Sequence, residues 1–216
     1  MVARFRLHAS PQDLAAWSHV PSLFPGADAR ERRTSSHRSF PALRLCPSTE
    51  KRQIVAMREG LIPSYAHDED GAEDRVNAHA EALTTTSCFR AAFLRRRCIV
   101  PATELTLPQH DSAGETHWLS LSRRSGALFG IAAVWETWTN DHGVAVETFA
   151  VITAPTASTT PELDRMPVIL ADHSQVRWLH AGAKDDLPFE LLRGLSASEL
   201  HDWRLAPYGL KVAMGV

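Results

Sequence analysis

The run ALFGIAAVW (127–135) is short, apolar and rich in residues that favour β-strands. Three runs of the same kind accompany it, and turn-forming segments separate them: RCIVPA (97–102), HWLSLS (117–122) and TFAVITA (148–154). We therefore expect a group of strands in the middle of the chain.

Helix-like segments flank this strand-rich middle. A serine before a proline, followed by apolar residues at i, i+3 spacing, predicts a short capped helix in HASPQDLAAW (8–17). The segment RVNAHAEALTTTSCFRAAFLRRR (75–97) is expected to be extended in its first half and helical in its second. Two more helices are predicted after the strands, in DHSQVRWLH (172–180) and LPFELLRGLSASELHDW (187–203). Strands in the middle with helices at both ends favour an α+β fold over regular alternation of strands and helices.

The composition is typical of an ordinary globular protein. Of 216 residues, 44% are hydrophobic and 22% are charged, so we expect a single domain over residues 1–216. The formal net charge of -2 excludes a global basic field, so any affinity for nucleic acid has to come from local groups of arginines. The first group is interpreted as solvated surface and consists of Arg30, Arg32, Arg33 and Arg38. The second group suits a helix-end or phosphate-facing role as well as it suits solubility, and consists of Arg95, Arg96 and Arg97.

Cysteine usage and hydropathy indicate the compartment. Cys46, Cys88 and Cys98 lie far apart without a C-x-x-C pair, which fits a reducing environment better than a disulfide framework. The first residues, MVARFRLHAS (1–10), lack the apolar core of a signal peptide, and no apolar run approaches the length of a membrane span. We expect a cytoplasmic protein without a membrane partner.

Common catalytic and metal-binding motifs do not occur in the sequence. There is no G-x-S-x-G, H-E-x-x-H, Walker or G-x-G-x-x-G motif. HDEDG (67–71) suggests a calcium loop, but that alignment puts Ala66 first and Asn77 twelfth, where acidic ligands are needed. The 11 histidines show no recognisable ligand spacing. We expect neither a metal ion nor another cofactor.

A series of short fragments points to a family. They are MVARF (1–5), GLIPSYA (60–66), NAHAEA (77–82), SCFR (87–90), RRRCIVPA (95–102), GIAAVWE (130–136) and LDRMPVIL (163–170). Their order and spacing resemble the SRAP family, the SOS-response-associated peptidases or abasic-site-processing proteins, from residue 1 to about Leu179. The resemblance implies an antiparallel, barrel-like β-core flanked by helices. It also implies a role in the SOS response to DNA damage, in a bacterial or phage-related context.

The resemblance implies covalent chemistry whose reactive residues this sequence lacks. In the family, the amine and thiol of a cysteine exposed by removal of the initiator methionine capture the aldehyde of an abasic site in single-stranded DNA as a thiazolidine. A glutamate and a histidine serve as acid and base. These three positions are occupied here by Val2, Leu107 and Leu163, none of which carries a thiol or an exchangeable side-chain proton. We therefore expect no intact catalytic residue and lean towards a protein that is not an enzyme.

Other family positions suggest that contacts with DNA are retained. Arg4, Asn77, Arg90 and Arg165 match the family, while His79 replaces an arginine and is mostly neutral above its reference pKa of about 6.5. A tyrosine stands at one tryptophan position, where it could stack on a base, and Glu59 at another is expected to repel a phosphate. The residues expected to contact DNA are Arg4, Tyr65, Asn77, His79, Arg90 and Arg165, with Glu81, Glu104 and Pro167 in support. Each also has a structural interpretation: Asn77 could close a turn, and Arg165 could pair with Asp164 or Glu162.

Three functions remain open at this stage. The first is weak, salt-dependent binding of single-stranded or abasic-site DNA without capture. The second is an altered enzyme whose Val2 α-amine, with a pKa of about 8, forms a reversible imine, with Glu104 as the nearest substitute carboxylate. On a strand, however, Glu104 would face away from Leu107. The third is a module for a protein partner, which Glu59 and the acidic segment HDEDGAED (67–74) favour.

Overall fold

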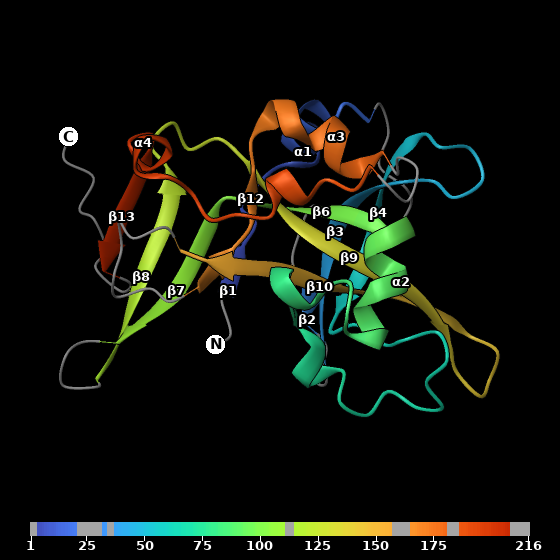
Figure 1. The fold of residues 1–216 in the computed structure, drawn as a ribbon. Coiled ribbons are helices and arrows are strands. Elements are labelled where there is room, and N and C mark those ends of the chain that lie inside the picture. The colour runs from blue at the N-terminus through green and yellow to red at the C-terminus, as the bar shows by residue number, and fades with distance from the viewer. Residues whose placement is uncertain are drawn as a thin grey trace.

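The computed structural model describes residues 4–20, 32–33, 37–110, 115–156, 165–180 and 186–207. These residues form two β-sheets with short helices around them (Figure 1). None of the helices in this described part is long and apolar enough to cross a membrane.

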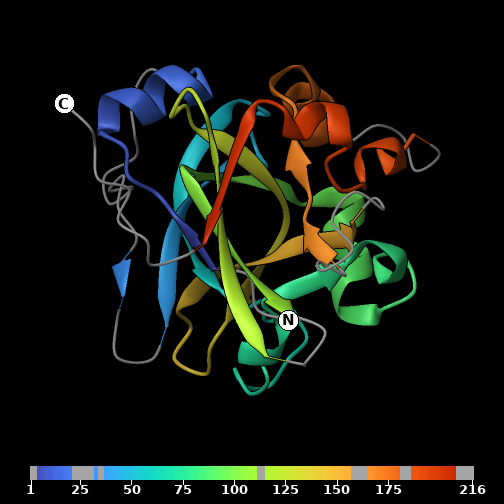
Figure 2. The ribbon, with the colours of Figure 1, turned by 90° about the vertical axis from the view of Figure 1, so that its left-hand side faces the viewer.

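The larger sheet has the strand order β11-β10-β4-β3-β6-β9-β12. Its strands are β3 (Arg38–Leu45), β4 (Arg52–Glu59), β6 (Arg97–Ala102), β9 (Phe129–Thr139), β10 (Ala145–Pro155), β11 (Arg165–Pro167) and β12 (Ile169–Leu170), with β2 (Arg32–Arg33) on β3 and β5 (Asn77–His79) on β10. Because β10 also pairs with β9, the strands β10, β4, β3, β6 and β9 close into a ring, whose curvature Figure 2 shows. Pairing is antiparallel except between β10 and its neighbours β4 and β5. The expected α+β fold with a barrel-like, mostly antiparallel β-core is confirmed.

The smaller sheet is antiparallel and has the order β1-β7-β8-β13. Its strands are β1 (Arg4–Arg6), β7 (Glu104–His110), β8 (Thr116–Arg123) and β13 (Trp203–Pro207). One face of this sheet carries the buried residues Phe5, Leu105 and Leu121, which belong to the same hydrophobic cluster as Phe149 of β10. This shared cluster joins the two sheets.

Short helices complete the fold. They are α1 (Pro11–Ser18), α2 (Ser87–Arg95), α3 (Gln175–Leu179) and α4 (Ala197–Leu200), together with the 3-10 turns η1 (Glu73–Arg75), η2 (Ala80–Ala82), η3 (Asp172–Ser174) and η4 (Phe189–Leu191). Ser10 caps α1 through a reciprocal pair of hydrogen bonds with Asp13, as the serine before the proline predicts. The helices expected near residues 8–17, in the second half of 75–97 and within 172–180 are present as α1, α2 and α3.

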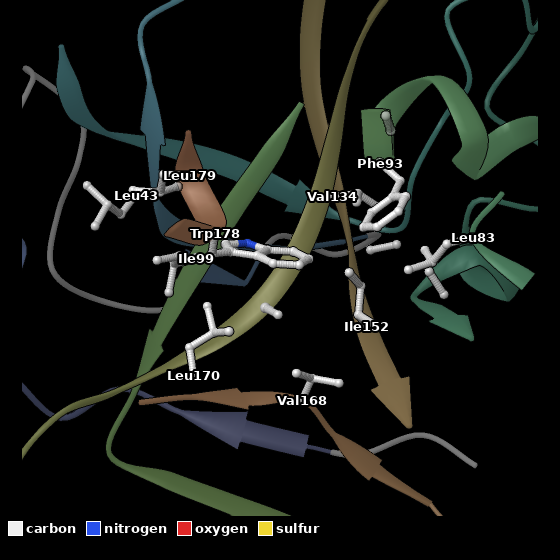
Figure 3. Close-up of a cluster of buried hydrophobic side chains, with 14 of the residues drawn as sticks. Leu43, Leu83, Phe93, Ile99, Val134, Ile152, Val168, Leu170, Trp178 and Leu179 are labelled. Carbon is white, nitrogen blue, oxygen red and sulfur yellow. The ribbon is translucent and has the colours of Figure 1, made fainter. Parts of the chain in front are cut away.

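Alternate residues of the ring strands supply two hydrophobic clusters. Cys98 and Val100 belong to the cluster shared with the smaller sheet, whereas Ile99 faces the other way. That second cluster is centred on the fully buried Trp178 of α3, whose indole nitrogen donates to the carbonyl oxygen of Cys98 at 2.9 Å (Figure 3). The Phe93 ring of α2 lies 6.2 Å from the Trp178 ring, so an aromatic contact joins α2 to α3 above the strands.

The prediction of a helix over residues 187–203 is wrong for most of that segment. The described part of it, Leu187 to Trp203, contains only η4 and the single turn of α4, and β13 begins at Trp203. Gly194 lies between the two turns, where a Cβ would come within 3.0 Å of the backbone oxygen of Pro155, and Ser196 caps a new helix start. Strand pairing with β8 then overrides the helical pattern of the sequence at Trp203.

Candidate nucleic-acid interface

The end of β10 brings together three of the six residues expected to bind DNA, namely Asn77, His79 and Arg165. β5 pairs with it in parallel, so Asn77 lies opposite Val151 and His79 opposite Thr153. β11 pairs with it antiparallel, so Pro167 also lies opposite Thr153. Two segments far apart in sequence thereby meet around one residue.

Arg165, the first residue of β11, is held by a network of acceptors. Its two terminal nitrogens donate to the two carboxylate oxygens of Glu81 at 2.8 and 2.8 Å. One of them also donates to the carbonyl oxygen of Thr153 at 2.8 Å. The hydrogen bonds from Arg165 lower the pKa of Glu81 to about 2, so the carboxylate stays ionised at neutral pH. The partner of Arg165 within the described residues is thus Glu81, while Glu162 and Asp164 lie outside them.

Leu107 of β7 occupies an apolar environment. Its side chain is 1% exposed and lines a small cavity that is bounded by leucines and one methionine. The other residues lining it are Leu119, Leu121, Met166, Leu195, Leu200 and Leu205. None of these side chains can donate or accept a proton, so this cavity offers no acid or base.

Glu104 does not compensate for this absence. It lies three residues before Leu107 on β7, at odd spacing, and therefore on the other face of the sheet. There its carboxylate accepts a hydrogen bond from the Ser120 hydroxyl at 2.5 Å. Glu104 supports the outer face of the smaller sheet rather than the apolar cavity.

The neighbours of the three replaced positions lie close to one another. Val2 and Leu163 lie outside the described residues. Arg4 is opposite Thr106, the residue before Leu107, and Met166, the residue after Arg165, lines the cavity with Leu107. A residue of β11 thus lies beside the buried side chain of Leu107, and β1 pairs with the strand that carries Leu107.

Arg4 makes an aromatic contact that was not predicted from the sequence. The exposed Arg4 guanidinium lies 4.9 Å from the centre of the Trp118 ring. The signal for Trp118 is present in HWLSLS (117–122), where alternation puts this tryptophan on the same face as Ser120 and Ser122. A large aromatic residue among serines on a polar face is unusual and could have been noticed.

Tyr65 and Arg90 form a second group at the start of α2. The Tyr65 side chain is 66% exposed, and its hydroxyl lies 3.4 Å from the Ser87 hydroxyl. Arg90 is exposed and follows Ser87 by three residues, which puts both on one face of the helix. An exposed aromatic ring and a cation therefore stand near each other on this helix.

Some expected surface charges have structural roles instead. Glu59 is largely buried and pairs with Arg38 at 3.3 Å, and Arg38 also donates to the carbonyl oxygen of Phe5 at 3.3 Å. The pairing with Arg38 offsets the charge of Glu59 and so weakens the expectation that Glu59 repels a phosphate. Arg38 itself is not a purely solvated residue. Arg97 is buried and donates to the carbonyl oxygens of Phe93, Trp178 and His180. It secures the end of α2 and has no donor directed at a phosphate.

The described residues contain no group of three or more histidine, cysteine or carboxylate side chains arranged to hold a metal ion. Cations, one exposed aromatic ring and an apolar pocket are the features that this interface offers. Such an arrangement can hold an anionic, partly aromatic polymer by charge and stacking.

Comparisons with known proteins agree with this description. The sequence model of a family described as "SOS response associated peptidase (SRAP)" matches residues 1–207. The abasic site processing protein YobE of Bacillus subtilis is 30% identical over 211 residues, covering 95% of this chain and 94% of that protein. The abasic site processing protein YoaM of the same organism is 28% identical over 184 residues, covering 83% of this chain and 79% of its own length.

Solved structures share the fold. A crystal structure of a protein from Bordetella bronchiseptica aligns with a TM-score of 0.76 at 21% identity, covering 97% of this chain and 100% of that one. A protein from Bacteroides thetaiotaomicron aligns with a TM-score of 0.67 at 25% identity over 78% of this chain and 73% of its own.

Proposed function

Because this chain belongs to the SOS response associated peptidase family, we propose that it binds single-stranded DNA, including DNA with an abasic site, without forming a covalent bond. A role related to DNA damage follows from the family and from relatives that are named abasic site processing proteins. The non-covalent mode rests on this chain's own residues. The proposal includes the cytoplasm as location, for which the three free cysteines, all within the described residues, give support.

The observation that carries the proposal is the contrast between Arg165 and Leu107. Arg165 is held in a fixed position by Glu81 and Thr153, as a residue that positions a ligand needs to be. Leu107, by contrast, faces only apolar side chains. A positioned cation beside a position that has no acid or base supports binding without covalent capture.

Two kinds of contact would hold the strand. Arg4, Arg90 and Arg165 supply cations for the phosphates, and Tyr65 supplies a ring for a base. The carboxylate of Glu81 offsets part of the positive charge of Arg165, so the contact of Arg165 with a phosphate should be weak. We therefore expect low affinity that falls steeply with salt.

The altered enzyme and the protein-binding module have less support. Glu104 faces away from Leu107 and accepts a hydrogen bond from Ser120, so it does not replace the missing carboxylate at the position of Leu107, which an altered enzyme would need. Glu59 is paired with Arg38, so it gives little support to an acidic surface for a protein partner.

Fluorescence anisotropy with labelled single-stranded DNA tests the proposal. We expect Arg165→Ala to weaken binding by about tenfold and to reduce the dependence on salt, because one phosphate contact is removed. Arg177→Ala is the matched control: Arg177 is also partly exposed and pairs with the carboxylates of Asp186 and Glu190 on another part of the surface. Binding that is insensitive to salt, or that both variants weaken equally, would contradict the proposed interface.

A further inference from the structure

The outer face of the smaller sheet is basic and carries one tryptophan. The strand register places Arg4 beside Thr106, Trp118 beside Pro108, and Arg204 beside Ser122. Alternation along the strands puts these side chains on the face that is turned away from Leu105 and Leu107. This outer face is therefore opposite to the hydrophobic cluster that joins the sheets.

Trp118 differs from most tryptophans of the protein in its exposure. Trp135, Trp138, Trp178 and Trp203 are at most 6% exposed. Within the described residues, only Trp17 and Trp118 are partly exposed. A large aromatic side chain that remains accessible on a polar sheet face has surface available for a ligand.

The charges around Trp118 identify the class of ligand. Arg4 and Arg204 are exposed on this face, and so is Arg6 at the other end of β1. The carboxylate on the same face, Glu104, accepts a hydrogen bond from the Ser120 hydroxyl and keeps its negative charge, so three guanidinium groups stand against one carboxylate. Such a surface complements a polyanion.

The contact between Arg4 and Trp118 adds stacking to this charge. A guanidinium that lies over an indole contacts the ring through the face of the guanidinium plane. The N–H groups of the guanidinium point outward in that plane, where they can reach a phosphate. Aromatic rings and guanidinium planes are both groups on which proteins stack unpaired bases. The pair can therefore contact a base and its phosphate together.

We propose that this outer face is part of the path of single-stranded DNA, with Trp118 stacking on a base and Arg4 contacting the adjoining phosphate. The inference rests on the proposed function. The two surfaces share β7: Leu107 of this strand lines a cavity with Met166, next to Arg165, and the outer face lies on the other side of the same sheet. Trp118 would add a second aromatic surface to the exposed ring of Tyr65.

The test measures DNA affinity and tryptophan fluorescence on the full chain. We expect Trp118→Ala to weaken binding of an unstructured deoxyoligonucleotide by about tenfold without changing the salt dependence, because stacking releases no counterions. Trp118→Phe should retain most of the affinity, since a smaller ring still stacks. DNA should quench the fluorescence of the parent and of the control variant Trp17→Phe, but should quench Trp118→Phe much less.

The outcomes separate this inference from the proposed function. If Arg165→Ala weakens binding while a folded Trp118→Ala binds like the parent, the outer face is not used and the first interface stands. Quenching that persists in Trp118→Phe would overturn the inference as well, even if Trp118→Ala fails to fold. If the parent does not bind single-stranded DNA at all, both proposals fall.

Discussion

At the scale of single residues, the ion pair between Arg165 and Glu81 sets the charge of the interface. Arg165 is 21% and Glu81 54% exposed, so solvent screens the pair and its contribution to stability is modest. Its main effect is on position. The carboxylate and the Thr153 carbonyl oxygen fix the guanidinium at the end of β10, and a phosphate that approaches has to share it with Glu81.

The pKa of Glu81 predicts how this pair responds to acid. Because the folded-state pKa is lowered to about 2, the stabilisation is present above the unfolded value of about 4.3 and is lost as the pH falls towards 2. We expect Glu81→Gln to be less stable than the parent in urea unfolding at pH 6, with a smaller difference at pH 3. A difference that is the same at both pH values would show that the carboxylate charge does not stabilise the fold.

At the scale of elements, local signals were sufficient for α1, α2 and α3 but failed for residues 187–203 and for several strands. α1 could be predicted because its serine cap and apolar spacing act within a few residues. β3 could not, since it contains Pro41 and the buried Arg44, which pairs with Glu147 of β10 at 2.6 Å. A charged residue in a strand is predicted to be exposed as long as its distant partner is unknown.

The same limit applies to the site. The family fragments identified Arg165 and Glu81 as site residues, but the sequence suggested Asp164 or Glu162 as partners of Arg165 because they are its neighbours. The partner Glu81 is 84 residues away, and only the pairing of β5 and β11 with β10 brings it close. Trp118 was missed for a related reason, as its contact with Arg4 depends on the register of β1 on β7.

The apolar setting of β7 predicts the cost of restoring a carboxylate there. Leu107→Glu would place an unpaired charge among leucines, so we expect a loss of about 3 kcal/mol or more in the free energy of unfolding at pH 8. Burial raises the pKa of the introduced carboxyl, so the charge penalty is present above that raised value and disappears as the pH falls towards the unfolded value of about 4.3. Urea unfolding at pH 8 and pH 5 measures this recovery, with Leu107→Gln as a control whose penalty should not change with pH. Equal losses for Leu107→Glu at both pH values would mean that its carboxylate reaches solvent.

At the scale of the whole molecule, the chain has the fold of the family, while Val2, Leu107 and Leu163 occupy the positions at which the resemblance implies reactive groups. The sequence model of the family matches residues 1–207, β1 pairs with β7, and Met166 of β11 lines one cavity with Leu107 of β7. Thiazolidine formation needs an amine and a thiol on one terminal residue, and Val2 offers at most the amine. Such a scaffold can retain a DNA-binding surface after its chemistry has been lost.

Incubation with abasic single-stranded DNA tests this loss directly. We expect no heat-stable covalent band on a denaturing gel, and none after borohydride, which reduces an imine to a permanent amine. A band that requires the reductant would instead show that the Val2 amine forms a reversible imine. The variant with Val2→Cys, Leu107→Glu and Leu163→His should regain some heat-stable product, limited by the cost of the carboxylate in the apolar cavity. A heat-stable adduct from the unmodified protein without reductant would contradict the non-covalent mode, because an adduct that survives heating is covalent. Since position 2 has no thiol, another group of the protein would have to form it.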